Sequence, residues 1–185
     1  MAAVLARAHS SSASRTKERV TTRAHIIVAA LCVVFVSCTA RVSPDAGGRV
    51  SGSVTRVVDG DTIHVRFADT TEEIRLIGVD TPETVHPTKA VECWGPEASQ
   101  HTKTLLAPGT TVFVTRDIEA RDRFGRLLAY VYRASDNVFI NEELVAGGWA
   151  RPFPYEPNTS LASVFAHAAH NAQAMKLGLW AHCER

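Results

Sequence analysis

The sequence predicts an α+β fold, a five-stranded Greek-key barrel with about three helices packed on it. Two observations predict this fold. Short segments with the alternation of β-strands group at the start and in the middle of residues 50–185, and segments with helical periodicity lie between and after them. The resulting order, β-β-β-α-β-β-α-α, suits a small barrel covered on its outside by helices.

The first three strands are expected at residues 50–58, 62–67 and 73–79. In the second, Ile63, Val65 and Phe67 alternate with polar side chains, the pattern of a strand with one buried face. Asp59 and Gly60 precede it and form a dipeptide typical of a tight hairpin turn. The third strand is apolar on both faces near its end.

A helix is expected at residues 95–106, followed by strands at 111–116 and 127–132. Pro96 and Glu97 suit the first turn of this helix. Proline lacks an N–H that the first turn leaves unpaired, and a carboxylate is favoured at the positive end of the helix dipole. Pro108 and Gly109 end the helix.

Two more helices are expected, at residues 140–146 and 161–176. Glycines follow both of them, which is typical of helix ends. These glycines are Gly147 and Gly148 for the first helix and Gly178 for the second. The second helix has apolar residues at helical spacing and polar residues suited to cap its start. The apolar residues are Leu161, Val164, Phe165, Ala168 and Met175, and the capping residues are Asn158, Thr159 and Ser160.

The first forty residues do not resemble globular structure. Five basic residues and one acidic residue lie among Ala, Ser and Thr in residues 1–25, and an apolar run follows at residues 26–36. These are the charged and apolar regions of an export signal, and the run is shorter than the about 20 residues of a membrane-spanning helix. We assign residues 1–40 to an export signal, 41–49 to a linker and 50–185 to the folded domain.

Two processing sites fit the end of the export signal. Cleavage after Ala40 has small residues at the required positions and would release a secreted protein. The run Phe35-Val36-Ser37-Cys38 is similar to a bacterial lipoprotein box, in which Cys38 would carry the lipid. We therefore expect an exported protein that is either secreted or anchored to the cell surface through Cys38.

Cys93 and Cys183 are the two cysteines of the predicted domain. In an oxidising compartment two cysteines more often form a disulfide than remain as thiols. The alternative is that they never meet, because spacing in the sequence does not give a distance. Neither cysteine lies in the charged motifs described below, so we expect activity to survive reduction as long as the fold does.

Residues 50–185 contain thirteen Lys or Arg and seventeen Asp or Glu, a net charge of −4. This balance excludes a general basic coating that would hold nucleic acid everywhere. A polyanion must therefore bind at a local site.

One segment places charges where a strand is otherwise apolar. Arg75 lies between Ile74 and Leu76, and Glu83 follows further along. An acidic turn, Asp-Gly-Asp at residues 59–61, lies upstream. Burying such charges is costly unless they meet partners. A metal ion bridging to a phosphate would satisfy them, so this segment predicts a site for a phosphate and a cation.

Four motifs follow one another in the chain. They are Asp-Gly-Asp-Thr at 59–62, Arg-Leu-Ile-Gly-Val-Asp-Thr-Pro-Glu-Thr at 75–84, Gly-Pro-Glu-Ala-Ser at 95–99, and Asp-Arg-Phe-Gly-Arg-Leu-Leu-Ala-Tyr-Val-Tyr at 122–132. Together they resemble the staphylococcal nuclease (thermonuclease) family. The resemblance implies an OB-fold barrel and a calcium-dependent phosphodiesterase. Such an enzyme hydrolyses DNA and RNA with low sequence specificity and leaves a 3′-phosphate.

The resemblance implies a calcium site. Asp61 and Asp80 would bind Ca²⁺ through their carboxylates and Thr81 through its main-chain carbonyl, and calcium prefers such oxygen donors. The alternative is that both aspartates are turn residues, since Asp is common in turns. We assign Asp59 to the turn or to support of the site.

The same resemblance implies three catalytic residues. Arg75 and Arg126 would bind the scissile phosphate, and Glu83 would act as general base or order the attacking water. Each has an alternative: Arg75 in a buried ion pair, for example with Glu83, Arg126 as a solvated loop charge, and Glu83 as a turn carboxylate.

Substrate contacts are expected from one lysine and three aromatic residues. Lys89 matches a lysine of the family's substrate-side loop, with a solvated surface lysine as the alternative. Phe124 stands where the family usually has Tyr and keeps a face on which a base can stack. Around residues 153–155 the chain is one residue shorter than the family pattern, so either Phe153 or Tyr155 takes the place of the family's stacking tyrosine.

The expected partners are therefore DNA and RNA, preferably single-stranded or frayed, with Ca²⁺ as cofactor. We expect a monomer without an obligate protein partner. The alternative function is a non-catalytic OB-fold module that binds nucleic acid. A binding module would not need the full set of charged residues, which are Asp61, Arg75, Asp80, Glu83 and Arg126.

Overall fold

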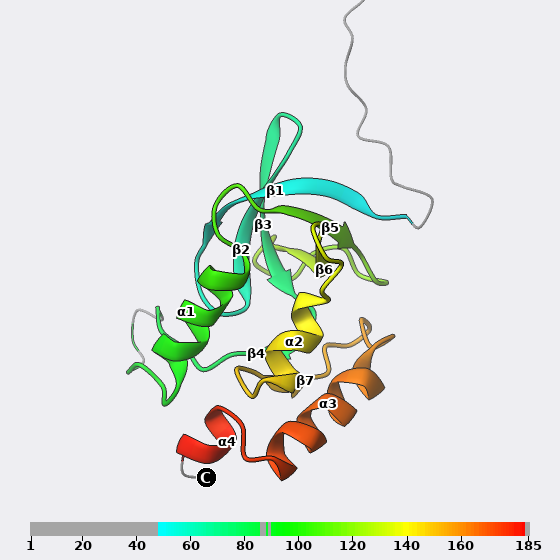
Figure 1. Cartoon of the computed structure of the whole chain (residues 1–185). Coiled ribbons are helices and arrows are strands. Elements are labelled where there is room, and N and C mark those ends of the chain that lie inside the picture. Colours follow the sequence, from blue (N-terminus) through cyan, green and yellow to red (C-terminus); the bar gives the residue numbers. More distant parts are fainter. Residues whose placement is uncertain (1–47, 86–87, 89, 184–185) are drawn as a thin grey trace, which may run out of the picture. The chain divides into compact units, whose positions relative to one another are not determined.

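Five strands close into a barrel in the computed structural model, which describes residues 48–85, 88 and 90–183 (Figure 1). The strands are β1 (Val50–Val57), β2 (Thr62–Phe67), β3 (Thr70–Leu76), β5 (Thr111–Thr115) and β6 (Leu127–Arg133). Their order around the barrel is β1-β2-β3-β6-β5. Neighbouring strands are antiparallel except β3 and β6, which are parallel. The predicted five-stranded barrel is confirmed.

The alternation seen in the sequence fills the barrel. Ile63 and Val65 of β2 and Ile74 of β3 are fully buried, and Ile63 pairs directly with Ile74. The polar residues between them, such as His64, lie on the outside of the sheet, where His64 pairs with Glu73. Each buried aliphatic side chain contributes about 1.5–3 kcal/mol. The barrel is thus a rigid platform for the loops at its ends.

The prediction of one continuous strand at residues 73–79 is wrong. The chain leaves the barrel after Leu76, and β4 (Gly78–Asp80) pairs instead with β7 (Arg151–Phe153) in a separate two-stranded sheet. Gly78 has φ of +79°, and a Cβ atom there would overlap the ring of Phe165. Only glycine accommodates both conditions. The third strand therefore begins earlier than predicted and ends at the break.

Four helices lie outside the barrel among the described residues: α1 (Gly95–Leu105), α2 (Ile140–Ala146), α3 (Ala162–Ala174) and α4 (Leu179–His182). Helix α2 packs between β6 and α3, and α1 lies beside β1 (Figure 1). The three longer helices confirm the predicted ones, whereas α4 and β7 were not predicted.

The expected cap and apolar face of α3 need correction. Leu161 is the residue before the helix, and no side chain caps its start. Asn158 instead binds the main chain of Glu119 through its side-chain amide, and the Ser160 hydroxyl donates to Asp117. At the other end Met175 is exposed. The buried face consists of Phe165, Ala168, Ala169 and Ala172.

The expected export signal at 1–40 and nearly all of the linker at 41–49 lie outside the described residues, as does Lys89. Within the described part of the chain, we find no helix with the length and apolarity needed to cross a membrane. The pairing of Cys93 with Cys183 is present as a disulfide, with the two Cα atoms 5.8 Å apart.

Candidate active site

The predicted charged residues meet in one cleft at the end of the barrel. The cleft has a volume of about 640 Å³ and lies between the hairpin turn after β1, the ends of β3 and β4, and the loop before β6. Its walls include every described residue predicted for metal binding or catalysis: Asp61, Arg75, Asp80, Thr81, Glu83 and Arg126.

Arg75 is the centre of this arrangement. Its Nη2 atom lies 3.2 Å from Oδ2 of Asp61 and 3.2 Å from Oδ1 of Asp80, and its side chain is largely buried. Its Nη1 atom donates to the carbonyl oxygens of Leu76 and Val79, at 2.9 and 2.7 Å. The ion-pair alternative from the sequence is thus realised with the two aspartates. One guanidinium brings both carboxylates together.

Asp61 connects the hairpin turn to the end of β4. Its Oδ2 accepts hydrogen bonds from the N–H and the hydroxyl of Thr81, at 3.0 and 3.1 Å. Its Oδ1 accepts from the hydroxyl of Thr62 at 3.1 Å. Asp61 is buried, so these contacts and the ion pair with Arg75 satisfy a charge that is mostly out of water. Its partners across the cleft go beyond what a turn residue requires.

Asp80 is more accessible, with 56% of its side chain exposed. Partial burial raises the pKa of Asp80, the charge of Arg75 lowers it in part, and the charges of Asp61 and Glu92 raise it further. The net direction is upward. Negative charge at this position is therefore only partly compensated by Arg75.

Glu83 and Asp59 meet beside Asp61 and Asp80, the two candidate metal ligands. Oε1 of Glu83 accepts from the N–H groups of Thr84 and Val85, at 2.9 and 2.8 Å. Asp59 is buried and accepts from the Thr84 hydroxyl at 2.7 Å. Burial raises the pKa of Asp59, and its contact with the Glu83 carboxyl adds to this rise. Asp59 also accepts from the N–H of Gly60 within the hairpin turn, at 2.8 Å, so its contacts fit both the turn role and the supporting role expected for it.

Arg126 is held by an aspartate that sequence reasoning missed. Its Nε donates to Oδ2 of Asp122 at 2.7 Å, and only 3% of the Asp122 side chain is exposed. Asp122 also accepts from the N–H groups of Phe124 and Arg126. Burial works against ionisation of Asp122, but these bonds outweigh it and lower its pKa. The sequence did carry a signal for this role of Asp122. An aspartate often opens a turn by accepting from main-chain N–H groups, and this turn ends in Gly125, which has φ of +86°.

The predicted aromatic residues also lie at the cleft. Phe124 and Phe153 line it with 70% and 47% of their surface exposed. Tyr155 joins them in an adjoining hollow that shares Arg75, Asp80 and Arg126 with the cleft. The guanidinium of Arg126 lies 5.5 Å from the centre of the Phe124 ring. The structure therefore places flat, exposed rings next to the charged residues.

The donor set at the cleft fits a hard cation. The carboxylates of Asp61 and Asp80 both contact Nη2 of Arg75, and carboxylate and carbonyl oxygens are the ligands that calcium prefers. Within residues 48–85, 88 and 90–183, no group of three or more His, Cys, Asp or Glu side chains is placed to hold a metal. A calcium ion here would take oxygens from the main chain, water or substrate besides the two carboxylates.

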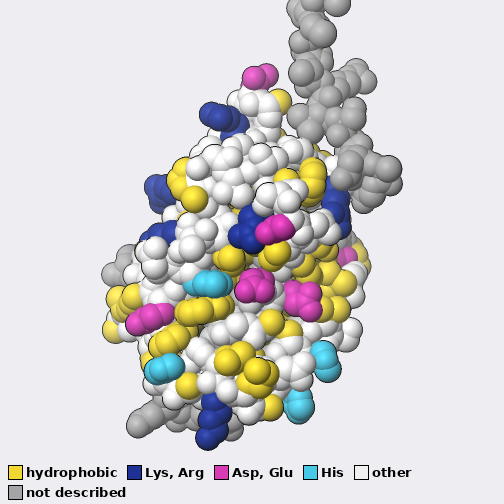
Figure 2. Space-filling view, viewed as in Figure 1, with side chains coloured by type: hydrophobic (Ala, Val, Ile, Leu, Met, Phe, Trp, Pro, Cys, Tyr) yellow, Lys and Arg dark blue, Asp and Glu magenta, His cyan; other side chains and the backbone are white. Residues whose placement is uncertain are grey.

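The face of the molecule in Figure 2 matches the charge balance of the sequence. Basic and acidic side chains are interspersed among the coloured atoms of this face, and no continuous basic surface covers it. Binding of a polyanion on this face would therefore depend on local contacts.

Comparison with known proteins agrees with the motifs. The profile of the family described as Staphylococcal nuclease homologue matches residues 73–182. The chain belongs to the staphylococcal nuclease family. It is 36% identical over 171 residues to a thermonuclease of Staphylococcus hyicus, a match that covers 89% of this chain and 99% of the relative. It is 42% identical over 127 residues to a thermonuclease of Staphylococcus intermedius, covering 69% of this chain and 74% of the relative.

A third relative is the endonuclease YncB of Bacillus subtilis. It is 37% identical over 132 residues, which cover 71% of this chain and 62% of that longer protein. Arg75, Asp80, Glu83 and Arg126 lie within the residues matched by the family profile, whereas Asp61 lies upstream of them. Family membership confirms the resemblance drawn from the motifs.

Proposed function

We propose that this protein is an exported, calcium-dependent phosphodiesterase that hydrolyses DNA and RNA with low sequence specificity and leaves a 3′-phosphate. One observation carries the proposal. A single guanidinium, that of Arg75, contacts the carboxylates of Asp61 and Asp80 in a cleft that also holds Glu83 and Arg126. The names of the relatives support nuclease activity.

The two arginines would bind the phosphate. Arg75 is oriented by two main-chain carbonyls and Arg126 by Asp122, so neither guanidinium has to be ordered when substrate binds. Their planar forks suit the oxygens of a phosphodiester. Donors fixed in advance stabilise the extra negative charge that builds on the phosphate as it becomes five-coordinate.

Glu83 would accept the proton of the attacking water. The main-chain N–H groups of Thr84 and Val85 donate to its carboxylate and thereby fix the orientation of that group. The water oxygen bonds to phosphorus as the bond from phosphorus to the 5′ oxygen breaks. The departing 5′ oxygen takes up a proton from water, so the products are a 3′-phosphate and a 5′-hydroxyl.

Asp61, Asp80 and the main-chain carbonyl of Thr81 would hold the calcium ion. When bound, the ion supplies positive charge against the phosphate and makes water a better nucleophile.

The exposed rings of Phe124 and Phe153 and the partly buried ring of Tyr155 would carry the bases. Stacking on a ring contributes about 1–3 kcal/mol per base and is nearly independent of sequence. It also requires unpaired bases, which supports a preference for single-stranded or frayed substrate. The signal-like residues 1–40 support export, with secretion or a lipid at Cys38 as the two alternatives.

The alternative is a module that binds nucleic acid without cleaving it. Incubation of the purified protein with heat-denatured DNA, with calcium and then with a chelator, separates the two. We expect fragments only with calcium, carrying 3′-phosphate ends that block extension by a polymerase until a phosphatase removes them. Binding without cleavage under both conditions would refute the enzyme. Fragments with 3′-hydroxyl ends would refute the proposed bond cleavage.

A further inference from the structure

We propose that Glu92 is a positioning residue for Glu83, and that the Cys93–Cys183 disulfide holds Glu92 in the position this requires. The inference rests on the proposed function, because it takes Glu83 to act on the attacking water. The sequence led us to expect only that activity survives reduction as long as the fold does; the inference adds that reduction lowers kcat.

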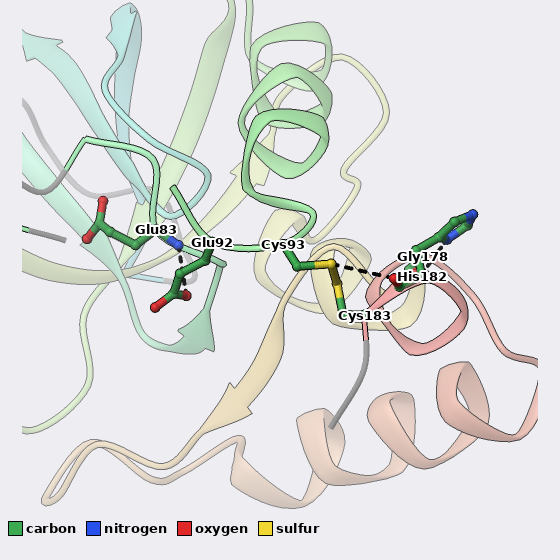
Figure 3. The surroundings of a disulfide bond; sticks show 6 residues. All are labelled: Glu83, Glu92, Cys93, Gly178, His182 and Cys183. Carbon is green, nitrogen blue, oxygen red and sulfur yellow. Dashed lines mark hydrogen bonds between the residues drawn. A yellow bond between two sulfur atoms is a disulfide. The ribbon is translucent and has the colours of Figure 1, made fainter. Parts of the chain in front are cut away.

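Glu83 and Glu92 are joined by two hydrogen bonds. The N–H of Glu83 donates to Oε2 of Glu92 at 3.1 Å, and the N–H of Glu92 donates to the carbonyl of Glu83 at 2.9 Å. Figure 3 shows the Glu92 side chain turned towards the backbone nitrogen of Glu83, whose own carboxylate points away from it. Glu92 thus holds the main chain of Glu83 and leaves its carboxylate to the cleft.

The residue after Glu92 is fixed to the far end of the chain. Cys93 is bonded to Cys183, which is 90 residues away and directly follows α4 (Figure 3). This covalent link limits how far Glu92 moves relative to the helices. Without it, the main chain around Glu92 would be tied to α4 only by noncovalent contacts.

Ring stacking supports the same segment. The ring of Trp94 stacks on His182 with centroids 4.2 Å apart and on Trp149 with centroids 5.8 Å apart. Trp94 also has φ of +69°, a conformation that is unfavourable for residues other than glycine and that persists only when its surroundings hold it. The disulfide joins the neighbours of the two stacked rings, Cys93 beside Trp94 and Cys183 beside His182.

Close packing transmits this restraint to Glu83. The N–H of Gly95 donates to the carbonyl of Glu92 at 3.0 Å. A Cβ atom on Gly95 would lie 3.0 Å from the carbonyl oxygen of Glu83 and 3.1 Å from that of Pro82. The segment from Glu92 to Gly95 is therefore pressed against the main chain of Glu83, and a shift of one segment displaces the other.

Two properties of Glu92 need to be separated by experiment. It accepts the hydrogen bond from Glu83, and its negative charge acts on Asp80 in the cleft. Glu92→Ala removes both properties. Glu92→Gln removes the charge but keeps an oxygen that accepts the same bond. Glu97→Ala is the matched control, because Glu97 is an exposed carboxylate in the first turn of α1.

We expect Glu92→Ala to lower kcat about tenfold, a loss typical of a displaced catalytic group, with KM within about twofold of wild type. Glu92→Gln should keep most of the activity, and Glu97→Ala should keep all of it. A kcat of Glu92→Ala within twofold of wild type would overturn the inference. A Glu92→Gln variant as slow as Glu92→Ala would overturn it as well, because the charge and not the hydrogen bond would then matter.

A double-mutant cycle tests whether the disulfide acts through Glu92. Glu92→Ala is combined with Cys93→Ser/Cys183→Ser, at a temperature well below the thermal midpoint of every variant. If the disulfide acts through Glu92, its loss lowers kcat in the wild-type background and has little further effect in the Glu92→Ala background. Independent effects on kcat would overturn this half of the inference.

If the Cys93→Ser/Cys183→Ser variant does not fold, dithiothreitol on the folded wild type takes its place. The reagent gives two electrons and two protons, closing into its cyclic disulfide while Cys93 and Cys183 become thiols. Amide hydrogen exchange provides a readout apart from activity. Loss of Glu92 or of the disulfide should speed exchange at the N–H of Glu83, and unchanged exchange in both would overturn the inference. A wild-type protein that cleaves no nucleic acid would instead refute the proposed function.

Discussion

Replacing Asp61 by Asn distinguishes between the two possible roles of Asp61, a metal ligand or only a turn residue. Asn keeps an oxygen that accepts from the N–H and hydroxyl of Thr81, and its amide donates to the hydroxyl of Thr62, which can turn to accept. Only the ion pair with Arg75 is lost, and Arg75 keeps Asp80 and two main-chain carbonyls as partners. If Asp61 is only a turn residue, the substitution should therefore have little effect.

As a calcium ligand, Asp61 contributes a full negative charge that Asn lacks. Calcium sites change their affinity over several orders of magnitude with the charge and rigidity of their ligands. Because Asp61→Asn removes the charge of one of the two proposed carboxylate ligands, we expect calcium affinity to fall on the order of a hundredfold. The same fall is expected for Asp80→Asn. The calcium-free protein with Asp61→Asn should remain within about 1 kcal/mol of wild type, since the hydrogen bonds are kept.

Asp80→Asn adds a test through pH. The pKa of Asp80 is raised in the folded protein, so the folded state binds this proton more tightly than the unfolded state does. Its ionisation therefore costs stability above the folded pKa, and this cost disappears as the pH falls below the usual carboxyl range near 4. Without calcium, Asp80→Asn should be at least as stable as wild type at pH 7, and the difference should shrink towards pH 4.

Titration calorimetry with a nucleotide present measures the calcium affinity, and thermal midpoints with and without calcium measure the stability. Calcium should raise the midpoint of the wild type more than that of either variant, because only tight binding to the folded state stabilises it. Unchanged calcium affinity in both Asp61→Asn and Asp80→Asn would refute the site, whatever their activity.

Three further predictions concern the proposed general base, the disulfide and the aspartate that orients Arg126. Glu83→Gln should lower the rate by about two to four orders of magnitude while calcium and nucleotide binding survive, and near-normal turnover of the folded variant would assign the task to another group. Thiol counting on the exported, denatured, unreduced protein should find Cys93 and Cys183 blocked; two free thiols would contradict the bridge. Asp122→Asn should lower kcat/KM about tenfold to a hundredfold, since a charged hydrogen bond contributes ~1.5–3 kcal/mol. Asp136→Asn, which breaks a surface ion pair, is its control and should match wild type.

The barrel could be predicted because its strands carry their own signal. Ile63 and Val65 alternate with polar residues, and this period is enough to identify β2 within its observed bounds. The break between β3 and β4 has no such signal. It depends on Gly78 meeting Phe165, a residue 87 positions further along the chain, so only the tertiary structure shows it.

The cleft shows the same division. The charged residues proposed to bind metal or phosphate, such as Asp61, Arg75 and Arg126, lie in motifs that resemble those of the family, so the sequence predicts them residue by residue. The residues that orient them could not be predicted, because their effect depends on a contact. Asp122 holds Arg126, and Glu92 holds the main chain of Glu83, yet each appears in the sequence as one more acidic loop residue.

The break in the third strand connects the fold to the cleft. Leu76 ends β3 and Val79 lies in β4, on either side of the turn at Gly78. The carbonyls of both residues accept from Nη1 of Arg75. The turn also directs Asp80 towards Nη2 of the same guanidinium, opposite Asp61. A glycine that has no side chain to contribute to the chemistry thus helps to determine where the arginine and both carboxylates meet.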